Sequence, residues 1–214
     1  MGAVGLVAAI ISISVGEGGP QAQRIGELGP VQQLYGGIPS EGAELGEPGA
    51  EVTVSVFTDL RCTDCAEYQI GTVDPLVEEF VRTGEARFEL RHYSLGSEST
   101  TLAAAAAVAA GEQGRQWQYA DLLFRNIGES RGQVDDEFLV DVADSLPELE
   151  VDIWEEDRAS ERVADVVEAD GVDGAELELL RDGPSVVVNG PGGVRSLGVA
   201  PTADEIRDAI AAVS

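Results

Sequence analysis

The chain has 214 residues, 43% of them hydrophobic, which is enough for one packed domain and ordinary for a folded globular protein. Its 40 acidic residues outnumber its 13 basic residues, and the formal net charge is -27. A surface of this sign repels phosphate backbones and anionic lipid headgroups, so the composition argues against nucleic-acid binding and against membrane docking through a basic patch.

The first residues form an apolar segment. Residues 3–15, AVGLVAAIISISV, carry no charge but are fewer than the roughly 20 residues that a membrane-spanning helix needs. Their number suits the apolar region of a secretion signal, although only Met1 and Gly2 precede them and neither is basic. We expect residues 1–15 to be an apolar leader or a truncated membrane anchor, with a short buried helix as the alternative.

Residues 16–50 are dominated by glycine, proline, glutamine and serine, and their apolar residues follow no sustained period of 2 or 3.6 residues. Such a composition is typical of a flexible linker. We therefore expect a Gly/Pro-rich tether that adds little to a core, followed by one folded domain over residues 51–214.

The folded domain begins with a β-α-β pattern. The run VTVSVFTDL, residues 52–60, alternates β-branched and apolar residues and predicts a buried strand. A helical pattern follows over about residues 62–81, and ARFELRHY, residues 86–93, predicts a second strand. Two strands joined by a helix form the unit of a parallel or mixed sheet.

A helical block over about residues 97–170 follows. The stretches STTLAAAAAVAAGEQ and RQWQYADLLFRNIG predict helices, as do residues near 134–146 and 152–169. PSVVVNGPGGVRSLG then predicts a β-hairpin, and TADEIRDAIAAV predicts a terminal helix in which Thr202 and Glu205 form a capping box. The predicted fold class is α/β: a β-α-β unit, an inserted all-helical subdomain and a final β-β-α unit.

Both cysteines of the chain, Cys62 and Cys65, lie in the motif LRCTDCAEYQ, between the first predicted strand and helix. A structural zinc site needs four ligands, whereas this chain adds a single histidine, His92, to the pair. A structural disulfide across so short a loop removes little entropy from the unfolded chain. Redox chemistry is the third role, and the position of the pair at the start of a helix favours it.

A helix N-terminus favours a thiolate at Cys62, because its unpaired N–H groups and the helix dipole stabilise an anion. The thiolate is the attacking species in thiol-disulfide exchange, so Cys62 is the candidate nucleophile and Cys65 the candidate resolving cysteine. Thr63 and Asp64 lie between them and are candidates for tuning the redox potential. Asp64 should repel a Cys62 thiolate and make the pair about 30 mV less oxidising.

With this motif the sequence resembles the thioredoxin superfamily, and within it the DsbA-like thiol-disulfide oxidoreductases of secreted or membrane-anchored bacterial type. The resemblance rests on GIPSEGAELGEPGAEVTVSVFTDLRCTDC, RHYSL, WQYADLLF and DGPSVVVNG, which occur in the family's order between about residues 37 and 213. It implies a thioredoxin-like fold with an inserted helical subdomain. Neither a cofactor nor a metal is predicted.

The resemblance also implies roles for further residues and partners. Pro184 would be a cis-proline facing the dithiol, and the Gly183–Pro184 backbone would hold an extended substrate segment beside Cys62. An ordinary trans proline at the start of a strand is the alternative. The implied substrates are cysteine-containing exported proteins, with a membrane quinone-linked redox partner. The implied location is extracytoplasmic, with the chain secreted or anchored by its N-terminal apolar segment.

The sequence departs from the family's pattern at two positions. Many members carry a buried carboxylate six residues before the first cysteine, where this chain has Val56, and many carry a proline where it has Thr63. Asp59, a nearby carboxylate, is expected to be a turn or capping residue. Four further residues are expected to pack rather than react: His92, Trp117, Tyr119 and Phe124.

Two alternatives to a disulfide-forming or rearranging enzyme are open. One is a reductant for a specific client protein, and the other is a redox-inert thioredoxin-like binding module whose cysteines form a structural bridge. The reactivity of the cysteines at neutral pH separates the enzymes from the module.

Overall fold

The structure is a computed structural model that describes residues 25–93, 98–128, 134–177 and 183–214. The predicted leader, residues 1–15, lies outside these ranges, as do the first residues of the predicted tether. Within the described ranges, no helix combines the length and the apolar character that crossing a membrane requires.

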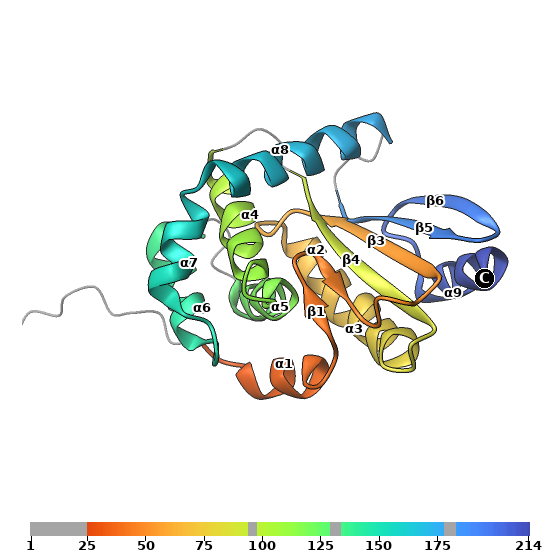
Figure 1. The fold of residues 1–214 in the computed structure, drawn as a ribbon, viewed down its shortest axis with the longest axis horizontal. Coiled ribbons are helices and arrows are strands. Elements are labelled where there is room, and N and C mark those ends of the chain that lie inside the picture. The colour runs from red at the N-terminus through yellow and green to blue at the C-terminus, as the bar shows by residue number, and fades with distance from the viewer. Residues whose placement is uncertain (1–24, 94–97, 129–133, 178–182) are drawn as a thin grey trace, which may run out of the picture.

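A six-stranded mixed sheet forms the centre of the fold, in the order β1-β2-β4-β3-β5-β6 (Figure 1). Strands β3 and β4 are parallel, and all other neighbouring strands are antiparallel. The strand bounds are β1 (Ser40–Glu41), β2 (Glu44–Leu45), β3 (Val52–Thr58), β4 (Ala86–His92), β5 (Ser185–Gly190) and β6 (Gly193–Val199).

The helical segment after β3 is continuous from Thr63 to Val81 and passes through two π-helical turns. It comprises α2 (Thr63–Tyr68), η1 (Gln69–Val73), α3 (Asp74–Leu76) and η2 (Val77–Val81). The remaining helices are α1 (Leu28–Tyr35), α4 (Glu98–Gly111), α5 (Gln116–Asn126), α6 (Asp136–Ser145), α7 (Val151–Arg158), α8 (Glu161–Glu176) and α9 (Ala203–Val213). The single helix predicted over residues 152–169 is therefore two helices, because Ser160 caps a new helix by accepting a hydrogen bond from the N–H of Val163.

The two parallel strands bury alternate residues, as period-2 patterning requires. In β3, Val54 and Val56 face the main core, and in the paired β4, Phe88 and Leu90 do the same. The intervening residues are half-buried on the other face, except Phe57, which is buried there. Full burial of a side chain of this size contributes about 1.5–3 kcal/mol, so this face of the sheet fixes the register of β3.

The prediction of a tether over residues 16–50 is wrong from residue 28 onward. Helix α1 buries Val31, Leu34 and Tyr35, and β2 buries Leu45 in the same core. Strand β2 also pairs antiparallel with β4. The many glycines and prolines of this region form turns between short elements, and the apolar residues of α1 span only one turn, too few to show a helical period.

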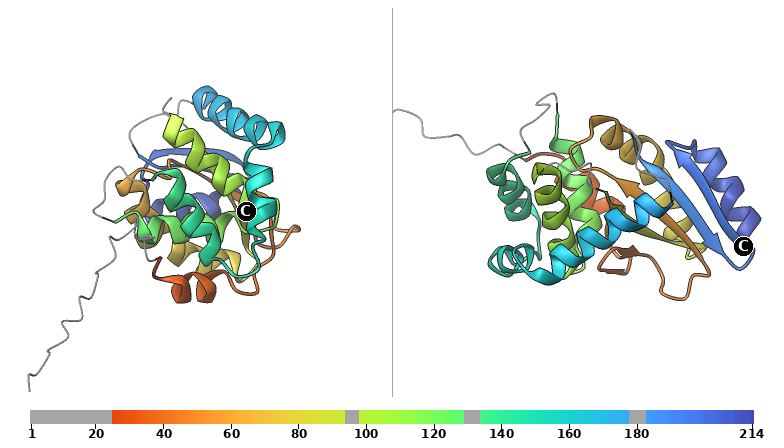
Figure 2. Two further views of the ribbon diagram at one scale, coloured as in Figure 1. Left: turned by 90° about the vertical axis from the view of Figure 1, so that its left-hand side faces the viewer. Right: turned by 90° about the horizontal axis from the view of Figure 1, so that it is seen from above.

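Helices α4 to α8 form the predicted insertion between β4 and β5. Helices α4 to α7 gather beyond one end of the sheet, opposite the hairpin β5–β6 and helix α9 (Figures 1 and 2). Helix α9 begins with the predicted capping box, in which the Thr202 hydroxyl and the Glu205 carboxylate each accept from the other's backbone N–H. The predicted α/β, thioredoxin-like fold with an inserted helical subdomain is thus confirmed.

Candidate active site

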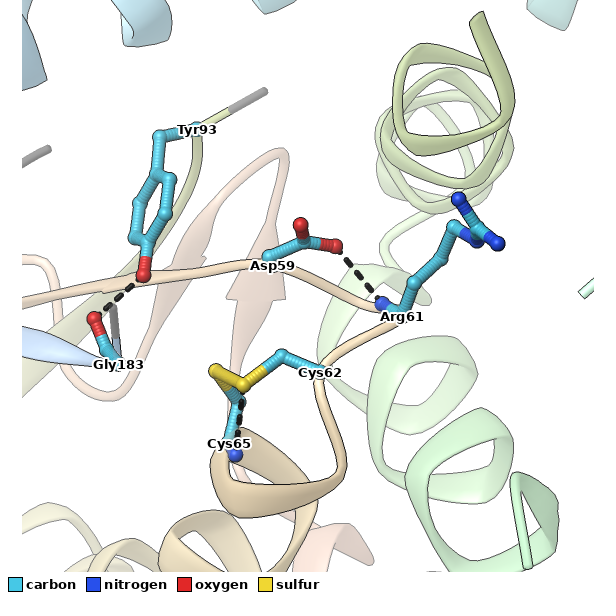
Figure 3. The surroundings of a disulfide bond; sticks show 6 residues. All are labelled: Asp59, Arg61, Cys62, Cys65, Tyr93 and Gly183. Carbon is cyan, nitrogen blue, oxygen red and sulfur yellow. Dashed lines mark hydrogen bonds between the residues drawn. A yellow bond between two sulfur atoms is a disulfide. The ribbon is translucent and has the colours of Figure 1, made fainter. Parts of the chain in front are cut away.

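Cys62 and Cys65 form a disulfide at the junction between β3 and α2 (Figure 3). Their Cα atoms are 5.1 Å apart. Cys62 is half-buried, whereas Cys65 is 1% exposed and belongs to the main core. The two sulfurs therefore differ in accessibility, and Cys62 is the one that a partner thiol can reach.

Cys62 is also the N-cap residue of α2. Its sulfur accepts a hydrogen bond from the backbone N–H of Cys65 at 3.1 Å, and its carbonyl accepts one from Ala66. A sulfur thus takes the place that a serine, threonine or aspartate oxygen usually has at a helix start. In the reduced state the same N–H groups, together with the helix dipole, favour the thiolate form of Cys62 over the thiol.

The two residues between the cysteines face different surroundings. Asp64 is exposed in the first turn of α2. Thr63 is half-buried and lines a groove of about 610 Å³ between α2 and the end of α5, together with Ile70 and Phe124. Both residues therefore lie next to the dithiol, but Thr63 is neutral and half-buried, whereas the Asp64 carboxylate lies in water.

Asp59 lies in the turn that leads from β3 to Cys62, as the sequence predicts. One carboxylate oxygen accepts a hydrogen bond from the backbone N–H of Arg61 at 2.8 Å, and the Asp59 carbonyl accepts one from the N–H of Cys62. Burial raises the pKa of Asp59, while the N–H and charge of Arg61 and a hydrogen bond with Thr100 oppose this rise. The Thr100 contact, which the sequence did not suggest, ties the helical insertion to the active-site turn.

Gly183 and Pro184 lie in the structure at the entry to β5, and both are buried. Figure 3 shows Gly183 and Tyr93 among the residues that surround the disulfide. The Tyr93 hydroxyl donates a hydrogen bond to the Gly183 carbonyl, a contact that the sequence analysis missed because 90 residues separate the partners.

The cis bond that the resemblance implies at Pro184 is not found, because the described residues contain no cis peptide bond. The trans form is the lower in energy for an X–Pro bond, and Gly183 gives the chain the freedom to reach β5 with it, at a φ of +136°.

The other residues singled out in the sequence have structural positions. Val56 is buried in the core face of β3, so no carboxylate occupies that point. His92 is 1% exposed, and burial together with the charge of Arg91 lowers its pKa to about 3, so its ring is neutral at physiological pH. Three aromatic side chains are core residues, as expected: Trp117, Tyr119 and Phe124.

A buried acid pair lies behind the active-site helix. Asp74 and Asp121 both bind Arg125, and Gln69, one turn after Cys65, donates a hydrogen bond to Asp74 at 3.0 Å. Burial raises the pKa of both carboxyl groups, and the charge of Asp74 raises that of Asp121 further. The Arg125 guanidinium therefore forms ion pairs with two buried carboxyl groups whose pKa values lie well above the usual range.

Comparison with known proteins shows which sequences and structures this chain is similar to. A family model described as Thioredoxin matches residues 40–210. The probable disulfide bond formation protein D of Bacillus cereus is 27% identical over 150 residues, which cover 68% of this chain and 69% of that protein. A Na⁺/H⁺ antiporter, NhaA 1 of Salinispora arenicola, is 35% identical over 144 residues, 66% of this chain but 20% of the antiporter. The crystal structure of oxidised BdbD from Bacillus subtilis has a TM-score of 0.69 at 23% identity and shares the fold over 82% of this chain and 95% of that one.

Proposed function

The chain belongs to the thioredoxin family, and from this we propose that it is a DsbA-like thiol-disulfide oxidoreductase. The observation that carries the proposal is the Cys62–Cys65 disulfide at the start of α2, with one sulfur reachable and the other buried. The likeness to the Bacillus cereus disulfide bond formation protein supports the same activity. The reaction class is exchange between this disulfide and the thiols of other proteins.

In the oxidising direction of the proposed exchange, Cys62 and Cys65 have different tasks. A substrate thiolate attacks the Cys62 sulfur, a new S–S bond forms, and the Cys62–Cys65 bond breaks with its electron pair on Cys65, which then takes up a proton. A second substrate thiolate attacks the substrate sulfur of this mixed disulfide and releases Cys62 as a thiolate. Two electrons pass from the substrate to the enzyme, and the N–H groups at the start of α2 stabilise the departing Cys62 anion.

Two pairs of residues have supporting roles in the proposal. Thr63 and Asp64 tune the redox potential, because they lie between the cysteines in the first turn of α2. Gly183 and Pro184 bind the substrate backbone in this proposal, because Gly183 lies on the side of the disulfide where Tyr93 also lies and Pro184 follows it at the start of β5. A chain segment that adds to a strand uses its backbone hydrogen bonds for affinity and its side chains for selectivity.

The substrates in this proposal are exported proteins with cysteines, and the chain acts outside the cytoplasm, secreted or held by the apolar segment of residues 3–15. Disulfides persist in oxidising compartments, and a chain whose two cysteines form one motif fits such a place. A membrane quinone-linked partner reoxidises the dithiol after each cycle.

The test is oxidation of a reduced peptide that carries two cysteines. The oxidised chain should convert it to the disulfide form, and Cys65→Ala should accumulate a mixed disulfide through Cys62. The matched control, Cys62→Ala, leaves the buried Cys65 and should trap little or no peptide. Reduction of insulin by the reduced chain measures the opposite direction and identifies a reductant. A pair that neither exchanges with peptides nor reacts with alkylating reagents after mild reduction would instead mark a redox-inert binding module.

A further inference from the structure

The peptide group before Pro184 is fixed by a side chain from a distant strand. Proline has no N–H, so the Gly183 carbonyl is the hydrogen-bonding atom of this peptide group. The Tyr93 hydroxyl donates a hydrogen bond to that carbonyl. We infer that Tyr93 is a positioning residue that sets the direction of the Gly183–Pro184 segment for polypeptide substrates, an inference that rests on the proposed function.

The segment needs such a contact because its own backbone does not define its direction. Gly183 has a φ of +136°, in a region that glycine enters freely, so the intrinsic backbone preference of this residue does not by itself select the observed direction. The chain after it is held by the neighbouring strand: the Pro184 carbonyl accepts a hydrogen bond from Ala200 at 2.7 Å, and Ser185 pairs with Val199. At the Gly183 carbonyl itself, Tyr93 supplies the hydrogen bond.

Tyr93 in turn is fixed to the strand that leads to the dithiol. Its N–H donates to the carbonyl of Thr58, the last residue of β3, at 3.2 Å. Its ring is 1% exposed and packs with Phe57 and Val187 in a small cluster on the second face of the sheet. Tyr93 therefore connects the end of β3, four residues before Cys62, with the start of β5 (Figure 3).

This placement predicts an effect on polypeptides and not on small thiols. A polypeptide laid along Gly183–Pro184 depends on the direction of this peptide group, because strand addition uses backbone hydrogen bonds. Glutathione can reach the Cys62 sulfur without an extended chain segment. The Tyr93 hydroxyl donates its proton to the Gly183 carbonyl, whereas the Cys62 sulfur accepts from the Cys65 N–H, so the redox chemistry itself should not change.

The experiment compares Tyr93→Phe with the wild-type protein in two reactions, exchange with a cysteine-containing peptide and exchange with glutathione. Phenylalanine keeps the buried ring and removes only the hydroxyl. Loss of one hydrogen bond should raise the KM for a cysteine-containing peptide about three- to tenfold, with kcat, the reduction potential and the rate of exchange with glutathione unchanged. Thermal unfolding of both chains shows that the variant is folded.

The matched control is Tyr119→Phe. The Tyr119 hydroxyl is also buried and also donates to a backbone carbonyl, that of Leu139 at 2.8 Å, but within the helical insertion. This variant should leave the KM for the peptide unchanged. The inference is overturned if Tyr93→Phe keeps the original KM, if it slows peptide and glutathione exchange equally, if it fails to fold, or if the control raises the KM as much. If the unchanged chain exchanges with no peptide, the proposed function fails instead.

Discussion

Replacing Asp64 by asparagine should make the dithiol more oxidising. In the reduced state, Cys62 caps the start of α2, where the backbone N–H groups favour its thiolate form. The Asp64 carboxylate lies in the same first helical turn and repels that anion. Asparagine keeps the size of the side chain and removes the charge, so it stabilises the reduced form and raises the reduction potential.

The expected size of this rise follows from the exposure of Asp64. Because this carboxylate lies in water, its interaction with a charge a few ångströms away is about 1 kcal/mol or less. Half to all of that energy, at about 30 mV per 1.4 kcal/mol for a two-electron couple, gives a rise of about 10–20 mV. This is smaller than the 30 mV expected from the sequence, because the structure leaves Asp64 screened by solvent.

The assay is redox equilibration of Asp64→Asn and the unchanged chain against glutathione at low and high salt. The control is Glu67→Gln, which removes another exposed charge one turn further along the same helix. This control should raise the potential by less than half as much, and high salt should shrink both effects. A potential for Asp64→Asn that is unchanged or lower, or a rise matched by the control, would refute the role of Asp64 at the helix start.

Three predictions concern stability. Burial raises the pKa of Asp121 to about 7. The folded chain therefore binds the Asp121 proton more tightly than the unfolded chain, and the resulting stabilisation is complete below about pH 4 and is lost as the pH rises through 7. Asp121→Asn should therefore flatten the fall in Tm between pH 5 and pH 8 and raise Tm at pH 8, and a variant that melts lower at pH 8 would contradict this. Thr202→Ala should cost about 1 kcal/mol in urea unfolding by removing the capping box with Glu205, and no loss would show that the cap is without effect. Trp154→Phe should cost about 2–4 kcal/mol in the same assay, because it leaves a cavity and removes the hydrogen bond from the indole N–H to the Ala106 carbonyl, whereas a loss below 1 kcal/mol would show that the core refills.

Local patterns in the sequence were enough for most elements that hold the dithiol. The alternation of β3 needs only its own residues, and a cysteine pair directly after a strand marks a helix start. The capping box of Thr202 and Glu205 is a four-residue signal, and both its hydrogen bonds are present. In each case the residues that form the element also carry its signal.

The sequence failed where the stabilising contacts are distant. Val31 and Leu34 belong to a helix of eight residues whose burial depends on α5 and the main core, so the glycines around it made it resemble a tether. The hydrogen bond from Tyr93 to Gly183 joins the end of β4 to the start of β5. These two ends come within reach of each other because of the strand order, in which β3 lies between β4 and β5. No local pattern reports such a contact, because it depends on the order of strands in the sheet.

Strand β3 explains why the parts of the site meet. It lies between β4 and β5, and its end leads through the Asp59 turn into Cys62. The strand ends on either side of it supply Tyr93 and Gly183, which hydrogen-bond to each other. Thr100 of the helical insertion forms a hydrogen bond with Asp59 in the same turn. Because all these contacts are made at the end of one buried strand, a change in its register would displace the Cys62 sulfur, the Gly183 carbonyl and the insertion together. Such a shift is opposed by every buried side chain on its core face.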